Sequence, residues 1–427
     1  MPIVKKQSRL RRSLSKTIPF LGHIKRIVEW QVIAPIRRMS TQHKTRLSGL
    51  HVDPYQIYWI SPHIINHTIY GPEDVPNPAN VSGMIKNGNW DRNTLPVQDL
   101  DIVRGAIDRF IKKIDWEKTE YYQNHLDHIS KGVQWRGCKN KDDLDIYCSR
   151  FDNLFKKIRD NGYQPQSKIK EDAYGNTAPV EHEITVHIDR DGNFLFCDGR
   201  HRFAIALALG IKKIPVKVCI RHAKWQTFCN EILSYTKKND GKVYQPVTHP
   251  DLRHIQSAHG EDRFKIISSN LPHGKGKLLD IGANWGYFCH CFEDLGFDCS
   301  AVEYDPGNIY FLEKLKTAQN RRFSIIQGSI LTYKEKDKFD IILALNIFHH
   351  FLKTETDYNA FIGLLKRIDM ETMIFEPHLT AEPQMKNAYR NYEPDEFLNF
   401  IIKHSCLNHS SLIGTAEDGR SIYKLWK

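Results

Sequence analysis

The sequence predicts an α/β protein with two domains, an N-terminal α+β domain and a C-terminal domain built around a βαβ unit, preceded by a basic helical arm. The chain of 427 residues is longer than one α/β domain of ordinary size. Strand-like apolar runs alternate with helix-like segments and glycine turns towards its end. We place the arm and the two domains at residues 1–48, 49–240 and 241–427, with the linker between the domains near residues 237–250.

The strongest pattern begins with Lys277–Ile281, which reads as a buried strand. Gly282 and Gly286 follow it in a turn that opens a helix. Glu303 ends the next expected strand, where an acid can hydrogen-bond ribose hydroxyls. Asp280 stands just before the glycines, where it would repel a pyrophosphate but favour a cationic ligand. The segment therefore predicts a site for a nucleotide-like ligand that has no pyrophosphate.

This segment resembles motif I of the class I S-adenosylmethionine-dependent methyltransferases, a family with a Rossmann-like fold. Later strands of the family have counterparts in Phe323–Ile326, Phe339–Leu345 and Thr372–Glu376, and the resemblance covers roughly residues 248–427. It implies S-adenosylmethionine as the cofactor, with Glu303 on the ribose. The positions that match the cofactor site of the family are Asp280, Gly282, Asn284, Gly286, Glu303, Ser329 and Asn346.

Two of these positions depart from the pattern of the family. Ser329 stands where the family often has an acid that hydrogen-bonds the adenine amine. Asn284 stands where the family commonly has the middle glycine of its turn. Asn is the non-glycine residue that best tolerates a positive φ, so we expect the turn to be kept.

Two histidines follow the fourth expected strand, at the edge of the sheet where ligands of such domains gather. Methyl transfer from a sulfonium needs mainly alignment of the acceptor with the methyl carbon. A hydroxyl acceptor would also need a base, and His349 or His350 is placed for that role, with Glu376 and His378 as weaker candidates. An anionic acceptor such as phosphate would need no base. The two histidines could equally cap a helix or line the pocket.

The loop Asn346–His350 also resembles that of the methyltransferase half of bacterial O-antigen chain-terminating kinase-methyltransferases. Those enzymes phosphorylate a glycan end and then methylate the phosphate. Their kinase half has a protein-kinase-like fold and their domain order differs, so the resemblance extends only to the logic of the two reactions. It implies a glycan, a glycolipid or a small polar molecule as the acceptor.

A second pattern, in the middle of the chain, is a β-hairpin that leads into a basic turn. Thr185–Ile188 and Phe194–Cys197 read as its strands, and the turn Gly199–Arg202 follows. Phe203–Leu209 then reads as an apolar helix ended by Gly210. Backbone N–H groups, the helix dipole and two guanidinium groups would converge at the start of this helix. This predicts a phosphate-binding site.

The Gly-x-x-Arg form of this turn resembles the nucleotide-binding turn of the ParB/sulfiredoxin superfamily, and the resemblance spans roughly residues 145–222. It implies a bound nucleotide, ATP or CTP, which often carries Mg²⁺. Asp198 could orient a metal or the turn, and His201 could touch a transferred phosphate. Kinase-like chemistry and nucleotide sensing are both consistent with the turn, and a purely structural, salt-bridged turn is the alternative. The positions assigned to the nucleotide are Gly199, Arg200 and Arg202.

Positive charge is confined to the beginning of the chain. Residues 1–50 hold twelve Lys or Arg against one acid, Glu29, and this excess of 11 equals the net charge of the whole chain, 61 minus 50. The two domains are therefore neutral together, which argues against a general nucleic-acid binder. Apolar residues recur at helical spacing between Phe20 and Trp30. They predict an amphipathic helix on an anionic membrane surface, and the alternatives are a helix packed on the protein itself or a partly disordered basic arm.

The nine cysteines are an odd number without the spacing of a disulfide framework, which predicts a reducing cytoplasm. Membrane attachment through the arm would place the protein at the inner face of the membrane. Cys289 and Cys291 read as helix-packing residues, so no metal site is predicted. Asn89–Asn93 and Trp116–Tyr122 contain aromatic and polar groups of the kind found in sugar sites, but we expect a structural role for them.

The sequence as a whole predicts a cytoplasmic methyltransferase that acts on an oxygen of a glycan, glycolipid or small polar acceptor. Its middle domain would bind ATP or CTP and could phosphorylate the same acceptor. Two alternatives stay open at this point. One is a tRNA or DNA methyltransferase tethered by the basic arm. The other is a nucleotide-sensing binding protein.

Overall fold

The computed structural model describes residues 39–43, 45, 49–50, 52–70, 81–165, 183–271, 274–334 and 337–427. These residues form two compact units. The first comprises the described residues up to Arg190 together with Phe194–Gln226, and the second comprises Asp191–Asn193 and Thr227–Lys427. The division falls within helix α8 (Ala223–Lys237). The apolar segment Phe20–Trp30 lies outside the described residues. Within the described ranges, no helix combines the length and the apolar character that a membrane span requires.

The first unit contains a mixed seven-stranded sheet, in the order β1-β7-β5-β6-β2-β4, with β3 paired to the remaining part of β7. β5 runs parallel to β7 and antiparallel to β6, so the expected hairpin is present at the centre of the sheet. Every residue of β5 and β7 is buried, as is usual for central strands. The strands are β1 (Ile57–Ile60), β2 (His67–Ile69), β3 (Met84–Lys86), β4 (Thr94–Pro96), β5 (Ile184–Ile188), β6 (Phe194–Asp198) and β7 (Ile214–His222).

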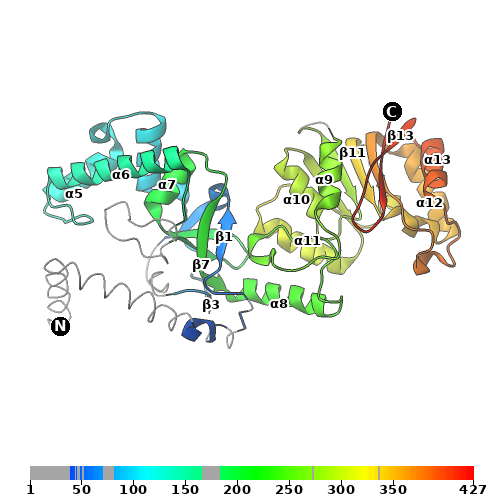
Figure 1. Ribbon diagram of the computed structural model, residues 1–427, viewed down its shortest axis with the longest axis horizontal. Coiled ribbons are helices and arrows are strands. Elements are labelled where there is room, and N and C mark those ends of the chain that lie inside the picture. Colours follow the sequence, from blue (N-terminus) through cyan, green and yellow to red (C-terminus); the bar gives the residue numbers. More distant parts are fainter. Residues whose placement is uncertain are drawn as a thin grey trace. The chain divides into compact units, whose positions relative to one another are not determined.

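The helices of the first unit lie together beside its sheet (Figure 1). They share one aromatic-rich core. Trp116, Tyr121 and Tyr122 are buried in it, which confirms the structural role expected for that segment. Trp90 is likewise buried, against the rings of His187 and His222. The helices are α4 (Asp101–Ala106), which continues as the π-helix η5 (Ile107–Ile111), α5 (Glu120–Ser130), α6 (Lys141–Asn161) and α7 (Arg200–Ala208), with short 3-10 turns η2 (Pro62–Ile64), η4 (Val97–Asp99) and η6 (Trp116–Lys118).

The second unit contains a seven-stranded sheet in the order β10-β9-β8-β11-β12-β14-β13. The first five of these strands are parallel, and β14 is antiparallel to both of its neighbours. The chain starts in the middle, at β8, moves outwards to β10 and then crosses to β11. This reversal is the topological switch point of a Rossmann-like sheet. The strands are β8 (Lys277–Ile281), β9 (Asp298–Glu303), β10 (Ser324–Gln327), β11 (Lys338–Leu345), β12 (Asp369–Glu376), β13 (His409–Thr415) and β14 (Ser421–Trp426).

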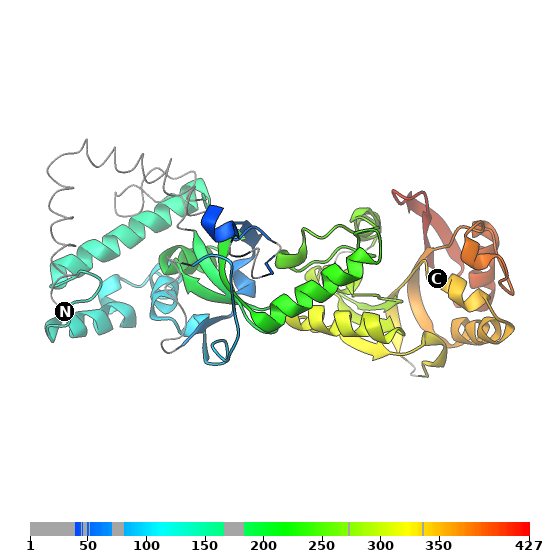
Figure 2. The ribbon, with the colours of Figure 1, turned by 90° about the horizontal axis from the view of Figure 1, so that it is seen from below.

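Helices cover both faces of this second sheet, as Figures 1 and 2 show. Alternate residues of a strand point to opposite faces, and the two cores follow that rule. Leu278 and Leu343 pack with α9, α10 and α11, whereas Leu279 and Ile342 pack with α12 and α13. Strands that are buried on both sides account for the continuous apolar runs in the sequence. The helices are α9 (Asp262–Ser269), α10 (Tyr287–Asp294), α11 (Pro306–Ala318), α12 (Glu355–Arg367) and α13 (Pro394–His404), with 3-10 turns η8 (Pro250–Leu252), η9 (Ile330–Thr332), η10 (Phe348–Leu352) and η11 (Pro383–Met385).

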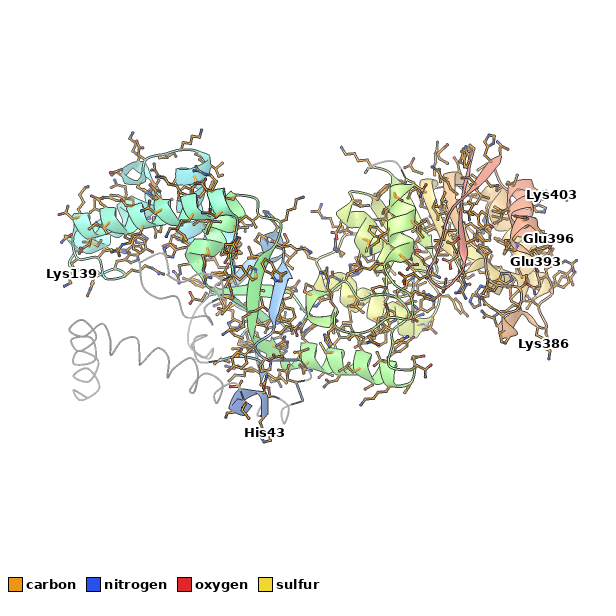
Figure 3. The ribbon with its side chains drawn as sticks, in the orientation of Figure 1. His43, Lys139, Lys386, Glu393, Glu396 and Lys403 are labelled. Carbon is orange, nitrogen blue, oxygen red and sulfur yellow. The ribbon has the colours of Figure 1, made fainter. Side chains whose placement is uncertain are left out.

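Local signals in the sequence fix the ends of α13. Glu393 and Glu396 form a reciprocal capping box at its start, and Pro394 occupies the first turn, where a missing N–H costs nothing. Lys403 lies in the last turn, where a cation opposes the negative end of the helix dipole. Figure 3 labels both glutamates and this lysine. The apolar face of α13 then packs against β12 and α12.

Candidate functional site

The loop after β8 has the backbone of a tight ligand-binding turn. Gly282, Asn284 and Gly286 have φ values of 75°, 52° and 83°. The positive φ of Asn284 confirms the expectation that it replaces a glycine without loss of the turn. A Cβ atom at position 282 would lie 2.8 Å from Cδ1 of Ile347, so only glycine fits between this loop and the loop after β11. The two loops at the switch point are therefore in contact.

Glu303 connects the end of β9 to the same loop. Its Oε2 accepts a hydrogen bond from the backbone N–H of Asn284 at 2.7 Å, and its Oε1 accepts from the N–H groups of Tyr304 and Asp305, both at 2.9 Å. The side chain is buried, and three N–H donors hold the carboxylate in one position. The charge expected at the ribose position is thus fixed beside the glycine loop.

Asp280 lies below the loop, within the sheet. Its side chain is 3% exposed, and its Oδ2 is 4.0 Å from Sγ of Cys289 on α10. Burial, together with the negative charge of Glu303, raises the pKa of Asp280 to about 7. The carboxyl group of Asp280 does not line the recess at the ends of β11 and β12. It can therefore affect a ligand there only through its charge or by shaping the glycine loop.

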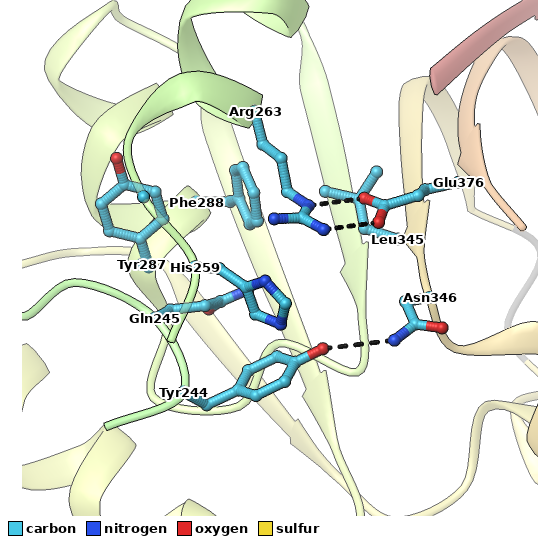
Figure 4. A pocket seen from close by; sticks show the side chains of 10 residues that line it. Tyr244, Gln245, His259, Arg263, Tyr287, Phe288, Leu345, Asn346 and Glu376 are labelled. Carbon is cyan, nitrogen blue, oxygen red and sulfur yellow. Dashed lines mark hydrogen bonds and ion pairs between the residues drawn. The ribbon is translucent and has the colours of Figure 1, made fainter. Parts of the chain in front are cut away.

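A small recess opens at the ends of β11 and β12 (Figure 4). Nδ2 of Asn346 donates to the Tyr244 hydroxyl at 3.5 Å. Oδ1 of Asn346 and Oε1 of Gln245 are buried and have no hydrogen-bond partner among the described residues. Two unpartnered acceptors in one recess are suited to a cationic or N–H-bearing ligand. The recess is lined by Tyr244, Gln245, His259, Gly260, Arg263, Tyr287, Phe288, Leu345, Asn346 and Glu376.

Sequence reasoning missed Tyr244, Gln245 and Arg263, because none of them belongs to a strand-turn pattern. Arg263 on α9 forms a bidentate ion pair with Glu376 at the end of β12, with both N–O distances at 2.7 Å. It also donates to Asp418 at 2.7 Å. Both partners of the Arg263–Glu376 pair are buried. The pair fixes the position of α9 against the strand end that forms one wall of the recess.

The histidine loop forms η10. His349 is 3% exposed, and neither of its ring nitrogens has a hydrogen-bond partner among the described residues. Its ring lies 4.1 Å from that of His350 and 5.6 Å from that of His378, centre to centre. Burial, followed by the positive charges of its two histidine neighbours, lowers the pKa of His349 to about 3. A neutral imidazole with free nitrogens thus lies close to the strand end, whereas His350 is exposed.

Ser329 lies on the far side of Glu303, after β10. Its hydroxyl accepts a hydrogen bond from the N–H of Leu331 at 3.2 Å and so caps the short helix η9. The neighbouring Gly328 donates its N–H to the carbonyl oxygen of Glu303 at 2.8 Å. The serine is therefore near the expected adenine position, but its hydroxyl has a local structural partner.

The basic turn of the first unit precedes α7, and Gly199 takes a left-handed conformation there. Asp198 is exposed and Arg200 is half-buried. Arg202 lies 3.5 Å from Glu183. Nε2 of His201 is within hydrogen-bond distance of the Tyr147 hydroxyl, and its pKa is lowered to about 4 by burial and then by nearby arginines. His201 therefore points into the helical core, whereas Asp198 and Arg200 remain at the turn.

Comparison with known proteins identifies part of the second unit. The sequence model of a family described as a methyltransferase domain matches residues 279–368. An uncharacterized methyltransferase from Mycobacterium avium (strain 104) is 34% identical over 73 residues, which are 17% of this chain and 28% of that protein. The chain thus spans under a third of the length of that relative. The second unit contains a methyltransferase domain, and this supports S-adenosylmethionine as its cofactor.

Solved structures of methyltransferases are also similar. The bifunctional kinase-methyltransferase WbdD is 20% identical, with a TM-score of 0.36 over 45% of this chain and 46% of that chain. Magnesium protoporphyrin IX methyltransferase from Synechocystis PCC 6803, solved with bound SAM, is 13% identical, with a TM-score of 0.29 over 38% of this chain and 75% of that chain.

Proposed function

We propose that the second unit transfers a methyl group from S-adenosylmethionine to an oxygen atom of a glycan, glycolipid or small polar acceptor. One observation carries this proposal: the glycine loop, the fixed carboxylate of Glu303 and the recess with two unpartnered acceptors all lie at the carboxyl ends of the central strands. Ligands of open parallel sheets bind at that edge, beside the switch point. The methyltransferase domain occupies the same strands.

The residues at this edge fit the cofactor. When bound, S-adenosylmethionine supplies an activated methyl group with a neutral leaving group. Glu303 would accept hydrogen bonds from the ribose hydroxyls, and the positive φ of the 282–286 loop lets its backbone approach the ligand. Oδ1 of Asn346 and Oε1 of Gln245 would accept N–H bonds from the cofactor's ammonium. These two acceptors would then be satisfied, which removes the cost of leaving them buried and unpaired.

His349 is the proposed catalytic base for a hydroxyl acceptor. Its ring is neutral and both of its nitrogens are available, so it can accept the hydroxyl proton as the oxygen attacks the methyl carbon. The low pKa makes it a weak base. The hydroxyl oxygen of the acceptor becomes acidic as its bond to the methyl carbon forms. His349 can take the proton at that stage of the reaction. Alignment of the acceptor supplies most of the rate enhancement.

For the first unit we propose nucleotide binding at the start of α7. Gly199, Arg200 and the first N–H groups of α7 would hold the phosphates of ATP or CTP, with Asp198 towards an accompanying Mg²⁺. Arg202 would support the turn through Glu183. The bound nucleotide would phosphorylate the acceptor or report its own concentration. The basic residues 1–48 would hold the enzyme at an anionic membrane surface.

Double labelling tests the proposed function. The full chain is incubated with methyl-labelled S-adenosylmethionine and γ-phosphate-labelled ATP, with a glycolipid and polysaccharide extract offered beside bulk tRNA. Methyl label in the glycan fraction is the expected result, and phosphate label in the same molecules would add kinase activity to it. Methyl label confined to tRNA would refute the proposed acceptor and favour the nucleic-acid alternative. The arm is tested by liposome flotation, where full-length protein that never floats with anionic vesicles would refute membrane attachment.

A further inference from the structure

A carboxylate–histidine pair lies among the helices of the first unit. Nε2 of His125 on α5 is 3.3 Å from Oδ2 of Asp101, the first residue of α4. Oδ1 of Asp101 accepts a hydrogen bond from the N–H of Ile102 at 2.6 Å, which orients the carboxylate. A carboxylate at one ring nitrogen favours the tautomer with the proton on that nitrogen. The other nitrogen, Nδ1, is then the basic one.

The surroundings of His125 hold its ring in a fixed plane. The ring stacks on Trp135 at 3.6 Å between centres and meets the edge of Tyr121 at 4.5 Å. His125 is 5% exposed, and neither of its ring nitrogens forms a hydrogen bond among the described residues, so Nε2 meets Asp101 only at ion-pair distance and Nδ1 has no partner there. A buried ring nitrogen without a hydrogen-bond partner is unfavourable. This arrangement is suited to a group that becomes paired when a ligand binds.

The pair lies next to the start of α7. α4 packs against α7, and the positive charge of Arg200 reaches Asp101. Burial opposes ionisation of Asp101, but the contact with His125, the hydrogen bond from the N–H of Ile102 and, to the smallest extent, the charge of Arg200 together lower the pKa of Asp101. Arg136 lies over the Trp135 ring at 5.6 Å, on the loop that covers His125. The two guanidinium groups and the helix start would attract phosphate to this part of the first unit.

We infer that His125 is the catalytic base of a phosphoryl-transfer reaction in the first unit and that Asp101 is its positioning residue. The inference rests on the proposed binding of a nucleoside triphosphate at α7. His125 accepts the proton of an acceptor hydroxyl at Nδ1, and the hydroxyl oxygen forms a bond to the γ-phosphorus. The bond between that phosphorus and the β,γ-bridging oxygen breaks, and the nucleoside diphosphate leaves with the electron pair. This places the base on α5, whereas His201 is turned away towards Tyr147.

Access to Nδ1 requires movement of the loop between α5 and α6. Trp135 stands on this loop, and Gly132 and Gly137 flank it with φ values of 78° and 90°. Displacement of the indole would uncover the edge of the imidazole. An acceptor would then lie between His125 and the phosphates at the start of α7.

The test separates nucleotide affinity from phosphoryl transfer in the full chain. Binding of ATP and of CTP is measured by calorimetry, and transfer is measured as label from γ-labelled nucleotide in water and in a glycolipid extract. His125→Ala should retain nucleotide affinity and lose transfer by about 10²–10³-fold. Added imidazole should restore part of the rate, which a structural role would not allow. Asp101→Asn should lose transfer, and Asp101→Glu should retain part of it.

His128→Ala is the matched control, because His128 is exposed on the same helix and its ring lies 6.4 Å from that of His125. This variant should transfer phosphate at the wild-type rate. Bound nucleotide with no transfer by the wild type, or transfer that His125→Ala leaves unchanged, would overturn the inference while the proposed nucleotide site stands. Failure of both nucleotides to bind would instead refute the proposed function of this unit, and the inference with it.

Discussion

Single residues decide which ligands the second unit can hold. The positive φ of Asn284 could be predicted from the sequence, because Asn tolerates the left-handed backbone conformation. The structure contains the expected turn. The burial of His349 could not be predicted in this way, since it depends on how η10 folds back on the sheet. The unpartnered Oε1 of Gln245 could not be predicted from the sequence either, because Gln245 lies outside the strand patterns.

Glu303 should be essential for cofactor binding. Glu303→Gln keeps the size of the side chain but removes the charge and brings an NH₂ group against backbone N–H donors. We expect the affinity for S-adenosylmethionine to fall about 10- to 100-fold in calorimetry, since hydrogen bonds to charged groups contribute about 1.5–3 kcal/mol each. Asp298→Asn, at the exposed opposite end of β9, is the control. Equal affinity in wild type and Glu303→Gln would remove Glu303 from the site.

Asp280 should make the stability of the protein depend on pH. Its folded-state pKa of about 7 lies above the ordinary value of 3.8, so the folded state binds the proton more tightly than the unfolded state. Stability therefore falls as the pH rises from about 4 to 7. Asp280→Asn removes this penalty and should raise the melting temperature more at pH 8 than at pH 5. An equal change at both pH values would show that the carboxyl is not protonated in the folded chain.

His349 should affect turnover without affecting cofactor affinity. His349→Ala is expected to lower the methyl-transfer rate about 10²-fold, the range of a lost base. Because the pKa of His349 is about 3, its ring is neutral throughout pH 5–8, and the wild-type rate should show no loss from its protonation in that range. His409→Ala, an exposed histidine on β13, is the control. A full rate in His349→Ala would favour an acceptor that needs no base.

At the level of elements, the sequence predicted the buried strands best. β8 has the expected bounds, and β11 and β12 begin within three residues of them, because apolar runs between turn residues leave few alternatives. α6 begins at Lys141 behind the capping residue Asn140, and Leu144, Tyr147 and Cys148 are buried at helical spacing along its first turns. The hairpin of β13 and β14 was not predicted. β13 is largely exposed and lacks an apolar pattern, whereas Ile422 and Leu425 of β14 are buried.

The buried ion pair between α9 and β12 should be a main determinant of stability in the second unit. Arg263→Ala leaves the Glu376 carboxylate buried without its bidentate partner and should cost about 3–5 kcal/mol in urea unfolding. Glu371→Ala breaks ion pairs of exposed groups with Lys338 and Lys427 and should change stability much less. Equal effects of the two substitutions would show that the Arg263 pair is not essential to this part of the fold.

At the level of the whole molecule, the two units differ in how directly their structures indicate their chemistry. The second unit combines a Rossmann-like strand order with a methyltransferase domain at residues 279–368, so its fold agrees with the family model that matches it. The first unit has a mixed sheet and a helical core, and its chemistry is proposed from the α7 turn and the Asp101–His125 pair. We therefore expect two ligands on one chain, each bound by its own unit.

Photo-crosslinking of methyl-labelled S-adenosylmethionine to the full-length protein, followed by peptide mapping, shows where the cofactor binds. The label should be found in peptides that contain the glycine loop at 282–286, Glu303 or the loop at 345–350, and excess unlabelled cofactor should abolish it. Label confined to peptides of the first unit would contradict the proposed site.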